Sequence, residues 1–279
     1  MTFKEKALSI WISVYIFAID LMRSLIIIKK HNSVSIFDYP EKNWNLVPFP
    51  FQKGDVFNAD NLATVNRHEF LINEKFIMAR NAAESRWGTE QVRDISWRLH
   101  VMLWAFGLAL KKSKINNVIF VECGTGRGYM AAGIAEFHNL DEKTPSFYLI
   151  DTFTSHLVLS SGNSIASPAH FAYSDGDDEV KEYFSRYSNI KIIKGLIPDA
   201  LQQLPNLPIG FLHIDLNNAD AENAALNYLA DRLISGSILI FDDYGGPGGN
   251  DQAIIHEIFA DNHNKELLVL PTGQAVIIW

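Results

Sequence analysis

From residue 118 to its end, the chain alternates short apolar runs with stretches whose apolar residues recur at helical spacing. Apolar runs of this length are typical of strands buried in a parallel sheet, and the helical spacing predicts helices between them. The predicted strands cover residues 118–121, 147–150, 190–193, 209–214, 237–241, 266–270 and 274–279. One predicted helix begins at residue 129, and three others cover residues 179–187, 219–233 and 250–260. The pattern therefore predicts an α/β domain.

The last two predicted strands are separated only by Pro271, Thr272 and Gly273. So short a connection joins neighbouring strands that run in opposite directions. The sheet is thus expected to end in an antiparallel pair.

The N-terminal part begins with an apolar segment. Residues 7–19 carry no charge, but Asp20 and Arg23 interrupt the segment before the apolar residues 25–28. Since a membrane-spanning helix needs about 20 apolar residues, an amphipathic helix over residues 7–28 fits better than a span. Three roles stay open: packing on the protein's own core or on a second copy in a homo-oligomer, peripheral contact with a membrane surface, and spanning.

The residues after this segment predict a linker and two further helices. Residues 31–60 are rich in proline and aromatic residues, which predicts an irregular linker. Helical spacing follows at residues 66–83 and 94–112. We therefore divide the chain into an N-terminal extension, residues 1–60, and a main domain, residues 61–279.

Charge and cysteine content limit the function classes. The chain has 24 Lys and Arg against 32 Asp and Glu, a net charge of −8, which argues against a general nucleic-acid binder. The single cysteine, Cys123, cannot form a disulfide within the chain, and this fits a reducing compartment. We expect a cytoplasmic protein, at the inner face of a membrane if residues 7–28 bind lipid.

A glycine-rich turn follows the first strand of the alternating part. The segment from the strand end to the helix start reads Glu122, Cys123, Gly124, Thr125, Gly126, Arg127, Gly128 and Tyr129. Glycines permit positive φ and close backbone approach, and free N–H groups at a helix start favour negative groups. Residues 126–131 loosely satisfy the G-x-G-x-x-G/A pattern of dinucleotide enzymes. The frame from Glu122 to Gly128 resembles motif I of class I methyltransferases that depend on S-adenosylmethionine (SAM), where the turn receives the methionine part of the cofactor.

Acidic residues follow the strands of the predicted sheet. The strands end successively at Glu122, Asp151, Asp215 and the pair Asp242 and Asp243. Ligands of open parallel sheets bind outside the carboxyl ends of the strands, so we assign Glu122 to the methionine part of the cofactor and Asp151 to its ribose hydroxyls. The other three acids meet if the strands 209–214 and 237–241 are neighbours.

These three acids predict a metal site. No lysine or arginine lies within three positions of Asp215, Asp242 or Asp243. Clustered carboxylates without partners raise one another's pKa at a cost in stability, so a hard divalent cation such as Mg²⁺ is the economical explanation. The alternative is that the aspartates only cap turns.

The motifs around these acids resemble a known family. Residues 211–217 and 236–245, with supporting segments at 151–153 and 270–274, look like the metal-dependent sugar O-methyltransferases related to macrocin and noviose O-methyltransferases. The similarity covers roughly residues 90–279. It implies a Rossmann-like sheet of seven strands with the last strand antiparallel, SAM as cofactor, and Mg²⁺ held by the residues that match Asp215, Asp242 and Asp243. Asp215 would then act in catalysis through the metal.

One position departs from the family. Some members carry a second aspartate two residues after the first metal ligand, proposed as general base, and this chain has Asn217 there. His156, His170 and His213 are candidates for the base, and the sequence does not choose among them. Catechol O-methyltransferases place a lysine where this chain has Asn218, which disfavours that branch.

The sequence thus predicts a SAM-dependent O-methyltransferase that acts on a hydroxyl of a small molecule, expected to be a sugar or a glycosylated metabolite. The rival enzyme is an NAD-dependent oxidoreductase, which the shifted glycine frame and Asp151 would allow. That rival does not explain Asp215 with Asp242 and Asp243. The rival outside enzymes is a SAM-fold binding protein without catalysis, whose N-terminal helix recruits partners or membrane.

Overall fold

The structure is a computed structural model that describes residues 57–60, 62–64, 68–87, 94–113, 117–154, 156–158, 164–166, 176–245 and 250–279. The predicted helix over residues 7–28 and most of the predicted linker lie outside these residues. Among the helices of the described part, none is long and apolar enough to cross a membrane.

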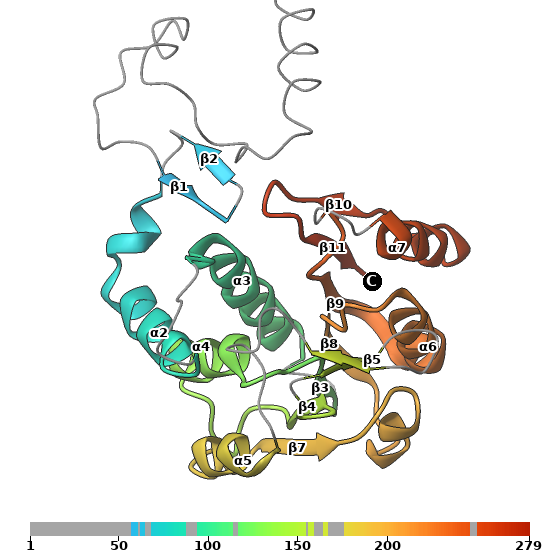
Figure 1. The fold of residues 1–279 in the computed structure, drawn as a ribbon, viewed down its shortest axis with the longest axis horizontal. Coiled ribbons are helices and arrows are strands. Elements are labelled where there is room, and N and C mark those ends of the chain that lie inside the picture. The colour runs from blue at the N-terminus through green and yellow to red at the C-terminus, as the bar shows by residue number, and fades with distance from the viewer. Residues whose placement is uncertain are drawn as a thin grey trace, which may run out of the picture. The chain divides into compact units, whose positions relative to one another are not determined.

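A seven-stranded sheet forms the centre of the fold (Figure 1), in the order β10-β11-β9-β8-β3-β4-β7. The strands are β3 (Ile119–Cys123), β4 (Phe147–Asp151), β7 (Ile190–Lys194), β8 (Ile209–Ile214), β9 (Leu233–Phe241), β10 (Leu268–Val269) and β11 (Ala275–Ile278). The pairs among β7, β4, β3, β8 and β9 are parallel, whereas β11 runs antiparallel to both β9 and β10. The prediction of a Rossmann-like sheet whose last strand is antiparallel is therefore confirmed.

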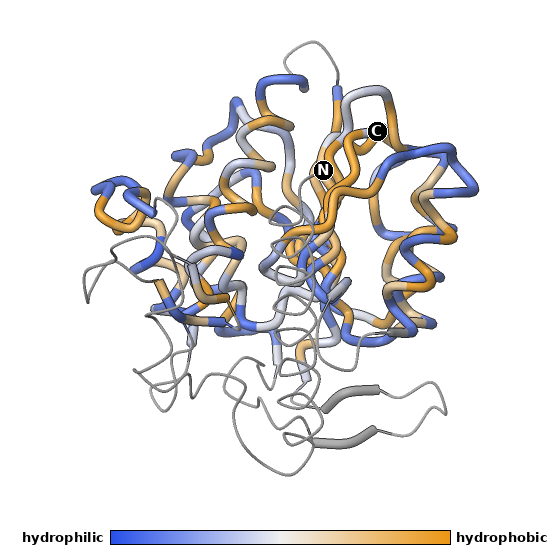
Figure 2. The backbone as a smooth tube through the Cα atoms, turned by 90° about the horizontal axis from the view of Figure 1, so that it is seen from above, coloured by the Kyte–Doolittle hydropathy of each residue, from blue (hydrophilic) through white to orange (hydrophobic). Residues whose placement is uncertain are grey.

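Helices cover both faces of this sheet. They are α2 (Glu74–Glu84), α3 (Ser96–Ser113), α4 (Tyr129–His138), α5 (Asp178–Phe184), α6 (Ala219–Leu229) and α7 (Asn250–Asn262), with 3-10 turns η2 (Glu69–Ile72), η4 (Asp199–Gln203) and η5 (Ala230–Arg232). Apolar residues of α2, α3, α4 and α5 pack in one core, and those of η4, α6 and α7 pack in a second. Strand residues alternate between the two cores, as the pleat requires. Figure 2 shows the hydrophobic strands between the two layers of helices.

Several predicted boundaries were wrong. The helix predicted at 66–83 is broken at Asn73, whose side chain accepts a hydrogen bond from the Phe76 N–H and so caps a new helix. The helix predicted at 219–233 ends earlier, because α6 ends at Leu229 and β9, which contains Ser235 and Gly236, begins at Leu233. Gly236 has a φ of 93° there, and the Ser237 hydroxyl donates to the carbonyl of Ile209. These contacts support an irregular strand, which the apolar pattern does not show.

Two small hairpins occupy segments for which no strand was predicted. Strands β1 (Phe57–Ala59) and β2 (Leu62–Thr64) pair at the end of the predicted linker. Strands β5 (His156–Val158) and β6 (Ser164–Ala166) pair inside the connection between the strand predicted at residues 147–150 and the helix predicted at residues 179–187. That connection therefore carries secondary structure of its own.

The sheet order decides which strand ends meet. Strand β3 lies between β4 and β8, and β9 pairs with β8, as expected for the strands 209–214 and 237–241. The carboxyl ends of β4, β3, β8 and β9 therefore share one edge. All the acids assigned from the sequence lie at that edge.

Candidate active site

The glycine turn brings two strand ends into direct contact. Gly124, Gly126 and Gly128 have positive φ of 92°, 54° and 90°. A Cβ at Gly124 would lie 1.7 Å from the backbone oxygen of Asp215, so only glycine fits between the ends of β3 and β8. The turn closes through a hydrogen bond from the Gly128 N–H to the Thr125 carbonyl at 2.8 Å. Helix α4 starts directly after it, with its free N–H groups at the turn.

Glu122 is buried beneath this turn. Its Oε1 lies 2.9 Å from Nδ1 of His213, and its Oε2 accepts a hydrogen bond from the Thr125 hydroxyl at 3.3 Å. Thr125 and His213 thus hold both oxygens of the carboxylate.

His213 is placed between two acids. It is fully buried, with Nδ1 at Glu122 and Nε2 3.8 Å from Oδ1 of Asp242. Burial alone would lower the pKa of His213, but Asp242 and Glu122 raise it to about 10. Because His213 is fully buried with both ring nitrogens facing carboxylates, the structure disfavours it as general base. The side chains of the other two candidates, His156 and His170, lie outside the described residues.

Asp151 is tied to the glycine turn. Its Oδ2 accepts a hydrogen bond from the Gly126 N–H at 2.7 Å, and its Oδ1 accepts one from the Phe153 N–H at 2.7 Å. Burial raises the pKa of Asp151, and these hydrogen bonds oppose the shift. The carboxylate therefore connects the ends of β3 and β4, where a nucleoside placed on the turn would reach it.

Asp215, Asp242 and Asp243 meet as predicted. One carboxylate oxygen from each lies within 4.8 Å of the others. Oδ2 of Asp243 is buried and has no hydrogen-bond partner. A buried oxygen without a partner is costly, and a divalent cation among the three acids would give it one. The donor set, three hard carboxylates, fits Mg²⁺ or a similar ion.

The sequence argument that these acids lack a basic partner was wrong. Nη1 of Arg98, from α3, lies 2.7 Å from Oδ2 of Asp242 and also donates to the Asp242 carbonyl at 3.1 Å. Gln274 donates to Oδ1 of the same carboxylate at 2.8 Å. Arg98 is 144 positions from Asp242, so a search for nearby charges along the chain could not find it.

The three acids differ in their protonation. Burial opposes ionisation of Asp242, but Arg98 and His213 hold its pKa well below the usual range. Burial and then the charge of Asp242 raise the pKa of Asp215, and the same two causes raise that of Asp243 to about 6. Asp242 is therefore the acid whose charge is compensated by the protein, while ionisation of Asp215 and Asp243 is disfavoured and a bound cation would favour it.

The two asparagines after Asp215 have structural contacts. Asn217, at a positive φ of 52°, donates from Nδ2 to Oδ1 of Asp215 at 3.1 Å. The side chain of Asn218 accepts the Ala221 N–H and caps α6. Asn217 thus orients Asp215.

A buried polar group behind the acids was missed by the sequence analysis. Glu222 of α6 accepts a hydrogen bond from Gln252 at 2.8 Å and lies 2.7 Å from Nε2 of His256, both on α7. The His256 ring stacks on Phe241, the last residue of β9, at 3.9 Å between ring centroids. These contacts join α6 and α7 next to the Asp242 and Asp243 pair. Helical spacing alone shows Glu222 as an ordinary surface acid.

A second group that the sequence analysis missed, Arg86 and Glu179, contacts the glycine turn at Arg127. Nε of Arg86, after α2, donates to the carbonyl of Arg127, and its Nη2 lies 3.2 Å from Oε1 of Glu179. Arg127 itself pairs with Oε2 of Glu179 at 2.8 Å. The first turn of α5 is therefore fastened to the glycine turn by two arginines.

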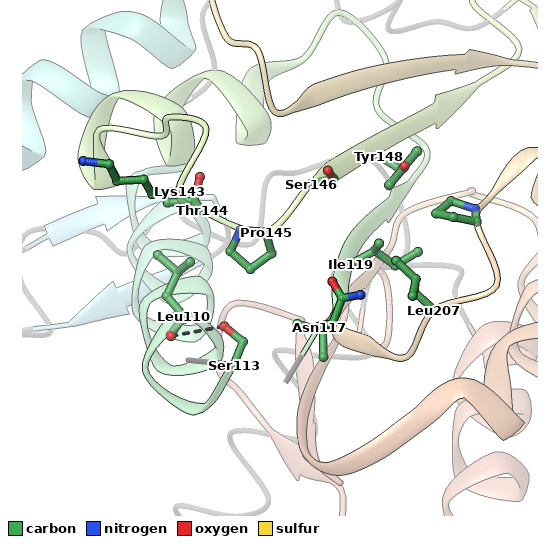
Figure 3. A pocket seen from close by; sticks show the side chains of 12 residues that line it. Leu110, Ser113, Asn117, Ile119, Lys143, Thr144, Pro145, Ser146, Tyr148 and Leu207 are labelled. Atoms are coloured by element: carbon green, nitrogen blue, oxygen red, sulfur yellow. Dashed lines mark hydrogen bonds between the residues drawn. The ribbon is translucent and has the colours of Figure 1, made fainter. Parts of the chain in front are cut away.

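A cavity lies at the other edge of the sheet (Figure 3). It has a volume of 640 Å³ and is lined by the amino ends of β3 and β4, the end of α3 and the turn before β4, including Ile119, Tyr148, Ser113 and Lys143. It contains none of the acids or glycines described above. Because ligands of parallel sheets bind at the carboxyl ends, we do not assign this cavity to the site.

Comparisons with known proteins bear on the fold. Residues 121–244 match the family model described as a methyltransferase domain. No curated protein sequence matches the chain. Among solved structures, the O-methyltransferase NovP superimposes with a TM-score of 0.57 at 16% identity, over 75% of this chain and 97% of that chain.

A calicheamicin methyltransferase, CalS11, superimposes with a TM-score of 0.54 at 19% identity, over 77% of this chain and 87% of that chain. A second structure of CalS11, described as a TDP-rhamnose 3'-O-methyltransferase, gives a TM-score of 0.50 at 19% identity, over 77% of this chain and 88% of that chain. At these identities the likeness establishes the fold.

Proposed function

We propose, on the premise that this chain is a class I SAM-dependent methyltransferase, that it methylates a sugar hydroxyl with the help of a divalent cation. The observation that carries the proposal is the meeting of Asp215, Asp242 and Asp243 beside the glycine turn. Cofactor and cation would then be held at the same edge of the sheet, with the acceptor between them.

The chain's own residues would hold the cofactor at the ends of β3 and β4. The glycine turn offers backbone N–H groups at the start of α4 to the methionine part, above the buried Glu122. Asp151 would accept hydrogen bonds from the ribose hydroxyls. Because Asp151 already accepts from the Gly126 N–H, it would also keep the turn in place while the nucleoside binds.

Asp215, Asp242 and Asp243 would hold the cation. When bound, Mg²⁺ would supply Lewis-acid stabilisation of the negative charge that develops on the acceptor oxygen. Asn217 orients Asp215 for this role, and His256, paired with Glu222, stacks on Phe241 directly before the Asp242 and Asp243 pair. The protein's further contribution is to align the acceptor with the methyl group and to exclude water.

A sugar acceptor is supported by two facts. The motifs of residues 211–217 and 236–245 resemble sugar O-methyltransferases, and one of the structures with the same fold is described as a TDP-rhamnose 3'-O-methyltransferase. Two adjacent hydroxyls on a sugar ring offer a cation two oxygen ligands. Such chelation would also select which hydroxyl reacts.

The N-terminal extension, residues 1–60, contains none of the proposed site residues. We keep the hypothesis that residues 7–28 dock on the protein's own core, on a second copy, or on the inner face of a membrane. Extraction of the full chain from membranes by alkaline carbonate would support docking, and extraction only by detergent would contradict it.

The experiment that tests the function combines calorimetry with a methyl-transfer assay on a panel of nucleotide-linked sugars. We expect S-adenosylhomocysteine to bind in the micromolar range, about −8 kcal/mol. We expect EDTA to stop transfer and Mg²⁺ to restore it. Asp243→Asn should lower the rate by at least about a hundredfold, or about 3 kcal/mol, and keep cofactor affinity.

Asp220→Asn is the matched control, since Asp220 is exposed in the first turn of α6 and lies outside the acid cluster. Full activity in EDTA would remove the cation from the proposal. Tight NAD⁺ binding without a response to SAM would contradict the proposal as a whole.

A further inference from the structure

Arg98 lies between two acids that come from distant parts of the chain. Its Nη1 pairs with Oδ2 of Asp242 at 2.7 Å, and its Nε pairs with Oδ2 of Asp60 at 2.7 Å. The three side chains are only 13%, 9% and 3% exposed for Arg98, Asp242 and Asp60 respectively. The arginine is thus a nearly buried cation shared by two carboxylates.

Asp60 belongs to the turn of the β1–β2 hairpin. It has a positive φ of 51°, and it lies outside residues 121–244, the segment that matches the methyltransferase-domain model. The hairpin therefore reaches the acid cluster through one arginine.

A bound divalent cation and Arg98 would compete for the same carboxylate. Oxygen ligands lie about 2.0–2.6 Å from Mg²⁺ or Ca²⁺, so a cation held by Asp242 would come within roughly 5 Å of the guanidinium. Like charges at that separation in a nearly buried site repel strongly. When the Asp242 carboxylate binds the cation, Asp60 still pairs with the guanidinium of Arg98.

We propose that Arg98 is a resident competitor that weakens divalent-cation binding at Asp215, Asp242 and Asp243, and that Asp60 relieves this competition by sharing the guanidinium. Arg98 is then a positioning residue that acts through Asp242, and the hairpin sets the affinity of a site to which it contributes no ligand. The inference rests on the proposed cation site.

Variants of Arg98 and of Asp60 are expected to change cation affinity in opposite directions. Arg98→Met removes a positive charge, and we expect it to tighten cation binding by about tenfold, or about 1.4 kcal/mol. Asp60→Asn removes one of the two carboxylates that pair with Arg98 and leaves Asp242 as the other. We expect cation binding to weaken by about fivefold, or about 1 kcal/mol. A role in folding alone would weaken binding in both variants.

The test is calorimetric titration of the full chain with Mn²⁺ at pH 8, in wild type and in four variants. Arg98→Lys keeps the charge and should change the dissociation constant by less than about threefold, or about 0.7 kcal/mol. In the double variant Arg98→Met with Asp60→Asn, the effect of Asp60→Asn should largely disappear, because the competitor is gone. Affinity for S-adenosylhomocysteine serves as the fold control and should stay unchanged.

Weaker or unchanged Mn²⁺ binding in a folded Arg98→Met variant would overturn the proposal. If that variant does not bind S-adenosylhomocysteine, Asp60→Asn decides: weaker Mn²⁺ binding supports the competition, and an unchanged affinity overturns it. A wild-type chain that transfers methyl groups but binds no Mn²⁺ would remove both the cation site and this inference. The methyltransferase function would then still stand.

Discussion

Gly124 offers a sharp test of the contact between the ends of β3 and β8. In Gly124→Ala the new Cβ would lie 1.7 Å from the Asp215 carbonyl oxygen, whereas ordinary contacts begin near 3.4 Å. The strand ends must therefore separate by about 1.5–2 Å, because a backbone oxygen cannot rotate away as a side chain can. The hydrogen bond from the Asp215 N–H to the Cys123 carbonyl, now 2.8 Å, lies directly at this point and would be broken.

The cost has two parts. Alanine at the positive φ of Gly124 costs about 1–2 kcal/mol. Leaving the buried N–H and carbonyl without partners adds about 1–3 kcal/mol. We therefore expect Gly124→Ala to lower the free energy of unfolding by about 2–5 kcal/mol and to abolish cofactor binding, since Gly124 is part of the turn proposed to hold the cofactor and the turn would be displaced with the end of β3.

Gly176→Ala is the matched control for this variant. Gly176 also has a positive φ, 109°, but a Cβ there meets nothing within 4 Å. It should cost only the conformational part, about 1–2 kcal/mol. Urea unfolding and calorimetry with S-adenosylhomocysteine measure both effects, and the reasoning fails if the two variants unfold alike and both bind the cofactor.

Two further predictions concern the carboxylates around the glycine turn. Asp151→Asn should weaken the binding of S-adenosylhomocysteine by at least about tenfold, because a neutral amide loses the charged hydrogen bonds from the Gly126 and Phe153 N–H groups. Asp141→Asn, in an exposed turn, is the control and should leave the affinity measured by calorimetry unchanged. The hydrogen bond from Arg127, more than the nearby charges, holds the pKa of Glu179 below its ordinary 4.5, so its contribution to stability is present above that pH and is lost as the pH falls through the lowered pKa. The urea concentration at the midpoint of unfolding, measured from pH 7 to pH 3, should therefore be higher for wild type than for Glu179→Gln at neutral pH, and the two midpoints should converge in acid. Glu182→Gln, on the same helix, is the control and should follow wild type. Parallel curves for wild type and Glu179→Gln would contradict this.

Local pattern in the sequence determined the sheet and the acids at its edge. Buried parallel strands are short and apolar, so the polar residue that ends each one is visible without a structure. Glu122, Asp151, Asp215, Asp242 and Asp243 were found in this way, and strand order then brought them to one edge. The glycine turn was equally visible, because its three glycines meet a need for positive φ that is local to the backbone.

The partners of these acids were decided only by the tertiary structure. Arg98 reaches Asp242 because α3 packs against β9, and the pKa of His213 is raised because Glu122 and Asp242 lie on either side of it. Such contacts depend on how helices pack over the sheet, while hydrophobic periodicity reports only which face of each element is buried. The protonation of a buried group follows from its neighbours in space, and therefore the charge balance of the site could not be derived before the strands and helices were in place.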